Sequence, residues 1–350
     1  MPSKIDKIIP IYYLIAILIL WFLLKQDAQE PDDFGFRPDP QATARFLSEL
    51  DKPTFGQAGE EIIKEAKRRD TFLWRYADRC HQLTYNKPFG PWRQGIGDCV
   101  SFGYAMSAYV AACCDYVNGE IPEAPLMPAT EAIYGGARVE QRGVDFAGYN
   151  DGATGSGAAR WIRGLDNGTG GIIFRENYGR GIDLTTYDKE RAKVWGAFGC
   201  GGRGNEWLDK QANKHIATVA QVRTYDEACA AIEAGAPIAI CCNIGWSSKR
   251  DKDGYAARSG RWLHCQSAIA CRYAEGPGKR DGILIINSWG DKWNSGPKWP
   301  SDQPDGSYWC DKKTFQAVLA QGESFAVSGV NGFHWRDLDH RAWLDKGKQK

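Results

Sequence analysis

The sequence lacks the features that mark several classes of protein. Its 44 basic and 43 acidic residues leave a net charge of +1, so it has no positive excess to neutralise phosphates, and we predict no nucleic-acid partner. It has five histidines and no Cys-x-x-Cys pair, so we predict no metal site. The Gly-x-Gly at 155–157 lacks a further glycine at the dinucleotide spacing, and no cofactor is predicted. Eleven cysteines, an odd number, do not indicate a disulfide framework.

Charge is also missing from one long run near the N-terminus. Residues 8–24 read IIPIYYLIAILILWFLL, and at about 1.5 Å per residue they extend roughly 25 Å, the short end of a membrane-spanning helix. A cleavable signal peptide is the alternative, but the following LLKQDAQE is a poor cleavage site. We therefore predict that residues 1–25 form an uncleaved anchor and that the protein binds the membrane through residues 8–24.

Charges on either side of this run predict its orientation. Lys4 and Lys7 precede it, whereas acidic residues outnumber Lys25 on the far side. Because positive charge stays on the cytoplasmic side, we expect a single-pass membrane protein whose remaining residues lie outside the cytoplasm.

The rest of the chain divides by pattern. Residues 26–84 are predicted to be a proline-rich linker followed by a helical extension, and residues 336–350 a basic tail. Residues 99–117 are predicted to form a buried helix, and Thr224 with Glu227 forms a capping box before another helix. Apolar runs predict strands at 238–242, 262–273 and 282–287. Helices dominate before about residue 170 and strands after it, which predicts an α+β fold with a helical half followed by an antiparallel β-rich half.

Three residues carry a pattern typical of thiol catalysis. A thiol nucleophile needs a base to remove its proton, a group that fixes the imidazole, and donors for the developing oxyanion. Cys99 begins the predicted helix, where the helix dipole favours a thiolate. His264 lies on a predicted strand, and Asn287 ends another and is followed by Ser-Trp-Gly. Each residue alone is more often structural: a buried cysteine, a core histidine or a turn asparagine.

Together these segments resemble the papain-like cysteine peptidases, as a divergent bacterial or phage-type member. NSWG, QGIGDC, TGSGAARW (154–161) and DGSYW (305–309) resemble family segments, and the order Cys, His, Asn is kept. The resemblance covers residues 85–335. It implies a cysteine-type peptidase acting on a peptide or protein, with Cys99 as nucleophile, His264 as base and Asn287 orienting the ring. It further implies Gln94 as an oxyanion donor; the other implied substrate-binding residues are Gly155, Ser156, Gly157 and Trp289.

The chain also departs from the family pattern. The interval from Gln94 to Cys99 is one residue shorter than usual, and Ile96 and Ala153 stand where a family disulfide would have its cysteines. Asp98, directly before the nucleophile, is expected to raise the pKa of the thiol. Two alternatives therefore stay open: a non-catalytic papain-like protein that binds peptides or is a structural surface component, and a Cys-His amidase or transglutaminase-type enzyme.

Overall fold

The computed structural model describes residues 32–141, 151–203, 206–274, 280–329 and 331–338. The anchor predicted at residues 8–24 lies outside these ranges. Within them, no helix has the length and apolar character needed to cross a membrane.

Helices supply most of the first two thirds of the described chain. They are α2 (Pro40–Ser48), α3 (Phe55–Ala58), α4 (Glu60–Glu65), α5 (Trp74–Tyr85), α6 (Cys99–Val117), α7 (Thr130–Gly135), the π-helical turn η1 (Gly136–Glu140), α8 (Gly155–Ile162), α9 (Lys189–Phe198), α10 (Glu206–Ala212), α11 (Tyr225–Glu233) and α12 (Lys312–Leu319). The strands are β1 (Asp32–Asp33), β2 (Thr71–Phe72), β3 (Asn177–Gly179), β4 (Ile182–Asp183), β5 (Val219–Gln221), β6 (Ile238–Cys242), β7 (Trp246–Arg250), β8 (Ala256–Arg258), β9 (Trp262–Arg272), β10 (Gly282–Ile286), β11 (Ser307–Asp311) and β12 (Ser324–Val327).

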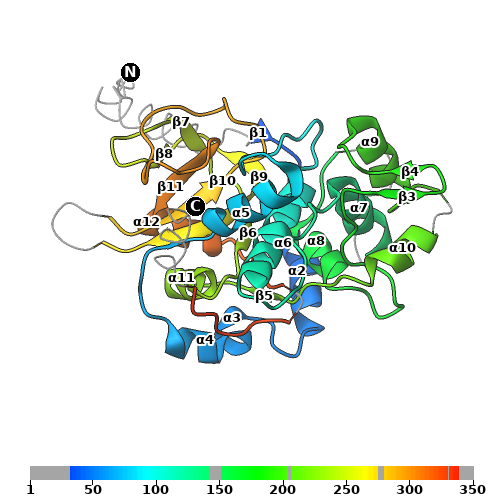
Figure 1. Cartoon of the computed structure of the whole chain (residues 1–350), viewed down its shortest axis with the longest axis horizontal. Coiled ribbons are helices and arrows are strands. Elements are labelled where there is room, and N and C mark those ends of the chain that lie inside the picture. The colour runs from blue at the N-terminus through cyan, green and yellow to red at the C-terminus, as the bar shows by residue number, and fades with distance from the viewer. Residues whose placement is uncertain (1–31, 142–150, 204–205, 275–279, 330, 339–350) are drawn as a thin grey trace, which may run out of the picture.

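The main sheet has the order β11-β10-β9-β6-β12-β5, and all of these neighbours pair antiparallel. Strands β6 and β10 are buried along their whole length, as expected for apolar runs. Helix α6 lies between this sheet and the group of α7, α8, α9 and α10 (Figure 1). The predicted α+β class is therefore confirmed.

The separation of helices from strands is less complete than the sequence predicts, because β1 precedes α2 and β2 lies between α4 and α5, yet both strands pair with β9. On one side of β9, β6 covers only residues 264–268, and on the other, β10 covers only 267–272. Part of β9 is therefore left unpaired on each side. Strand β2 pairs with β9 at residues 270–271, and β1 pairs parallel with it at residues 262–263. Backbone groups at an open edge need partners, and these short strands supply them.

Helix α6 lies directly against β9. Gly103, one turn after the start of α6, has no room for a side chain, since a Cβ there would lie 2.6 Å from the sulfur of Cys265. This close approach sets the N-terminal end of α6 beside the part of β9 that carries His264. The eleven cysteines, all within the described residues, are buried thiols.

Candidate active site

The predicted base and its orienting residue are hydrogen-bonded. His264 on β9 and Asn287, the residue after β10, are joined by a contact of 2.7 Å between Nε2 and Oδ1. The same Oδ1 accepts the backbone N–H of Ser288 at 2.7 Å, which identifies it as the amide oxygen. Nε2 must therefore carry the proton, and in the neutral ring Nδ1 carries the free lone pair. Nδ1 is buried and has no hydrogen-bond partner among the described residues. Its lone pair can therefore accept a proton.

Aromatic rings exclude water from this pair. The indole of Trp289 is stacked on the imidazole of His264, with ring centroids 4.7 Å apart and planes 25° apart. Phe34 meets the imidazole edge-on at 5.5 Å. Burial lowers the pKa of His264 to about 4, and the hydrogen bond that its Nε2 donates to Asn287 opposes the shift. In this state the ring is neutral at physiological pH.

Cys99 is the first residue of α6, as predicted, and is fully buried. Its position at the N-terminus of a long helix places the positive end of the helix dipole next to the thiol. The loop before it is tied to the segment after Asn287, because the N–H of Gln94 donates to the carbonyl of Ser288 at 2.9 Å and the N–H of Gly290 donates to that of Trp92. The loop before Cys99 and the segment after Asn287 are thus held together by backbone hydrogen bonds.

The Gln94 side chain is held in a defined direction. Its Oε1 accepts the hydroxyl of Ser288 at 2.6 Å, and its Nε2 donates to the carbonyls of Ile96 at 2.9 Å and Phe34 at 3.2 Å. One amide N–H therefore already faces a peptide carbonyl of another segment, which is what an oxyanion donor must be able to do.

That segment, residues 34–37, covers the site, and we call it the covering segment. The N–H groups of Phe34 and Phe36 donate to the carbonyl of Leu263, next to His264. On the other side, Ala153 donates to the carbonyl of Gly35 and accepts the N–H of Arg37, both at 2.9 Å, so the two backbones run parallel. Gly35 has φ +112°, and a Cβ there would lie 2.0 Å from the carbonyl oxygen of Gly97. The covering segment is thus in direct backbone contact with the loop that precedes Cys99.

Three of the residues predicted to line a bound peptide begin helix α8. Gly155, Ser156 and Gly157 form the buried first turn of α8, which Thr154 caps by accepting the N–H of Gly157 at 3.0 Å. The N–H of Ser156 donates to the buried carboxylate of Glu323 at 3.2 Å. The backbone that pairs with the covering segment is that of Ala153, two residues before α8 begins. The proline-rich stretch around Phe34 gave no periodic signal that could have revealed its role.

The expectation that Asp98 places a negative charge beside the thiol is wrong. Asp98 is fully buried, and burial raises the pKa of its carboxyl to about 8, although the hydrogen bond from the Tyr187 hydroxyl at 2.9 Å opposes the shift. Its Oδ1 has no hydrogen-bond partner among the described residues. The carboxyl is therefore mainly protonated at neutral pH and carries little charge.

The raised pKa of Asp98 predicts a pH-dependent stability change. The folded chain holds this proton up to about pH 8, whereas an unfolded aspartate releases it near pH 4, so the wild type loses stability as pH rises between these values. Asp98→Asn can still accept from Tyr187 but has no proton to lose. The gain in urea midpoint of Asp98→Asn over wild type should therefore grow from pH 4 to pH 8, whereas exposed Asp166→Asn should show little change. An equal gain at every pH would show that Asp98 is ionised in the fold.

Known structures share this fold. No protein-family model and no curated protein matches the sequence. Among solved structures, xylellain, a cysteine protease from Xylella fastidiosa, matches 86% of this chain and 98% of its own with a TM-score of 0.53 and 17% identity. Procathepsin B S9 from Trypanosoma congolense (TM-score 0.46, 10% identity, 90% of this chain and 97% of its own) and bromelain from Ananas comosus (0.44, 11%, 75% and 99%) also match. The predicted resemblance to papain-like cysteine proteases is thereby confirmed at the level of the fold.

Proposed function

We propose that this protein is a cysteine peptidase that uses Cys99, His264 and Asn287. The observation that carries the proposal is the hydrogen bond between His264 and Asn287, because it leaves a bare, water-shielded Nδ1 on the strand packed against the helix that Cys99 begins. A merely structural histidine would be expected to have both ring nitrogens satisfied when buried.

In the proposed mechanism, Nδ1 of His264 takes the thiol proton of Cys99, and the thiolate attacks a peptide carbonyl. The oxyanion is held by Gln94 and by the backbone N–H of Cys99. The imidazolium then returns a proton to the leaving amine, which gives a thioester that water hydrolyses with the same base. Asn287 holds the ring without exchanging protons, and Trp289 keeps water from their hydrogen bond.

A peptide substrate would replace the covering segment. Ala153 and Leu263 offer backbone groups on both sides of this position, so an extended peptide can bind by strand addition. While the covering segment is bound, His264 is dry and its low pKa opposes the imidazolium. Displacement of the segment would admit water and substrate and let the pKa rise toward the range that general-base catalysis needs.

We further propose that residues 8–24 anchor the protein in a membrane, with the peptidase domain outside the cytoplasm. The full-length protein should then stay in the membrane pellet after carbonate extraction, and a chain that begins after residue 25 should not. Added protease should reach the domain from the extracytoplasmic side only. Release of the full-length protein by carbonate would rule out the anchor.

Opening of the site can be tested with a pair of glycine variants. Gly35→Ala puts a methyl group into the Gly97 carbonyl, whereas Gly90→Ala adds one where no atom lies within 4 Å. Steric overlap of this kind costs 1–3 kcal/mol, so Gly35→Ala should speed iodoacetamide alkylation of Cys99 by about tenfold or more, and Gly90→Ala should leave it unchanged. Peptide mapping identifies the modified thiol. Equal rates in the two variants would mean that the covering segment does not restrict access.

The triad is tested in the full-length Gly35→Ala chain with a fluorogenic peptide library. Cys99→Ala should abolish turnover, and His264→Ala should lower it by roughly 10²–10⁴-fold. Asn287→Ala should cost less, because the ring can still reach the productive pose. Asn294→Ala, which alters a buried amide bonded to Ser307, is the matched control.

Two outcomes would favour other functions. If Cys99 in the open chain reacts no faster than a free thiol and is indifferent to His264→Ala, the protein is a non-catalytic peptide binder. If turnover requires an added amine acceptor, it is an acyl transferase.

A further inference from the structure

One hydroxyl group links both ends of the loop between the two predicted oxyanion donors. The oxygen of Tyr187 accepts the N–H of Gly95 at 3.1 Å and donates to Oδ2 of Asp98 at 2.9 Å. Gly95 directly follows Gln94, and Asp98 directly precedes Cys99. The distance between the Gln94 side chain and the Cys99 N–H is therefore set by a loop that a single residue closes across its ends.

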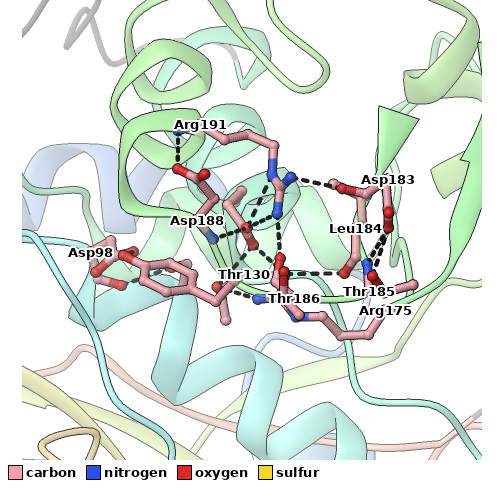
Figure 2. A network of polar contacts seen from close by, with 12 residues as sticks. Asp98, Thr130, Arg175, Asp183, Leu184, Thr185, Thr186, Asp188 and Arg191 are labelled. Carbon is pink, nitrogen blue, oxygen red and sulfur yellow. Dashed lines mark hydrogen bonds and ion pairs between the residues drawn. The ribbon is translucent and has the colours of Figure 1, made fainter. Parts of the chain in front are cut away.

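The residues on either side of Tyr187 belong to an ionic network, in which Figure 2 labels Thr186, Asp188 and Arg191. Glu131 on α7 is fully buried and makes ion pairs with Arg175 at 2.7 Å and Arg191 at 2.8 Å. Its Oε1 also accepts the N–H of Asp188, the residue after Tyr187, at 3.0 Å, and Arg191 donates to the carbonyl of Thr186, the residue before it. Backbone anchors on both sides leave the tyrosine little freedom to move.

The Tyr187 ring is packed as well as bonded. It meets the ring of Phe102 on α6 edge-on at 5.2 Å, and the guanidinium of Arg175 lies 5.9 Å from its centroid. Phe102 is one turn after Cys99 on the same helix. The ring thus contacts the nucleophile-bearing helix, while the hydroxyl holds the loop in front of it.

The loop also departs from the papain-like pattern that the sequence resembles. It is one residue shorter than in the papain-like pattern, and it carries Ile96 where that pattern has a disulfide cysteine. A second hydrogen bond, from the Gly97 N–H to Asp151 at 3.1 Å, holds the middle of the loop to the segment next to Ala153. Hydrogen bonds to Tyr187 and Asp151 thus hold the loop at the position where the papain-like pattern has a disulfide.

We propose that Tyr187 is a positioning residue that fixes the loop between Gln94 and Cys99 and so sets the spacing of the oxyanion donors. This inference rests on the proposed peptidase function. Tyr187 touches neither substrate nor reacting atoms, and acts through the backbone of Gly95 and the carboxyl of Asp98. Its loss should weaken stabilisation of the tetrahedral oxyanion and leave formation of the thiolate intact, because alkylation of a thiolate needs no oxyanion donors.

The experiment compares two probes of Cys99 in full-length chains, both wild type and Gly35→Ala. A peptide aldehyde forms a hemithioacetal whose oxygen needs the oxyanion donors, whereas iodoacetamide needs only the thiolate. Tyr187→Phe should weaken aldehyde inhibition and lower kcat by about 10–100-fold, with KM and the alkylation rate within about twofold. Asp98→Ala, which removes the other end of the same contact, should show the same selective loss.

The control is Tyr178→Phe, because the Tyr178 hydroxyl also accepts a backbone N–H at 3.0 Å, but from Phe174, which lies outside the 94–98 loop. It should leave both probes unchanged. Equal loss of aldehyde affinity and alkylation in Tyr187→Phe, or no loss in either, would overturn the positioning role. If neither parent chain cleaves peptides or binds the aldehyde, the proposed function itself fails, and the role of Tyr187 falls with it.

Discussion

The hydrogen bond between His264 and Asn287 depends on the register of two neighbouring strands. Strands β9 and β10 pair antiparallel, and the register shifts between Leu284 and Ile285, where Ile269 of β9 is passed over. Extending this register by one residue sets Asn287 opposite Gln266, on the face of the sheet that carries His264. Without the extra residue Asn287 would lie opposite Ser267, on the other face, because side chains alternate along a strand. A single bulge thus decides whether Asn287 lies on the same face of the sheet as His264.

Exclusion of water gives the site its second constraint. A neutral imidazole stacked under an indole keeps its hydrogen bond to Asn287, since water cannot compete for either group. Water is excluded from Cys99 too, because its side chain is fully buried behind the covering segment. Exclusion of water also disfavours a thiolate–imidazolium ion pair, because desolvation favours the neutral forms of both groups. The closed state therefore preserves the geometry of the site while opposing its ionisation.

Sequence patterns predicted the parts of the fold that local physics determines. The helix at 99–117 and the strand at 238–242 have the predicted bounds, because long apolar runs must be buried. Thr224 caps its helix as expected, although the Glu227 carboxylate accepts the N–H of Arg223 and not that of Thr224. The Asn-Ser-Trp-Gly segment pointed to the histidine and asparagine pair without any structural information.

Tertiary contacts explain what the sequence could not predict. Phe34 lies in a stretch rich in proline and acids, and its partners are more than fifty residues away, so it read as a linker. The bulge at Ile269 changes no periodic signal within an apolar strand. Tyr187 is one aromatic residue among many, and only the folded chain shows that its hydroxyl reaches Asp98. Sequence patterns thus predicted Cys99, His264 and Asn287, but they did not predict Phe34, the bulge or Tyr187, whose contacts place these residues.

The charge state of Asp98 shows how burial can reverse a prediction from sequence. An acidic residue before a helix is normally ionised there, since the helix dipole stabilises the charge by about 0.3–2 kcal/mol. Burying that charge with one hydroxyl donor costs several kcal/mol, which is more than the dipole returns. Glu131 in the same network is buried too, but two arginines balance it. The two buried acids are therefore stabilised in different ways. Asp98 keeps its proton, whereas Glu131 is paired with two arginines. Because Asp98 is neutral, it does not offset the effect of the helix dipole on the thiol of Cys99.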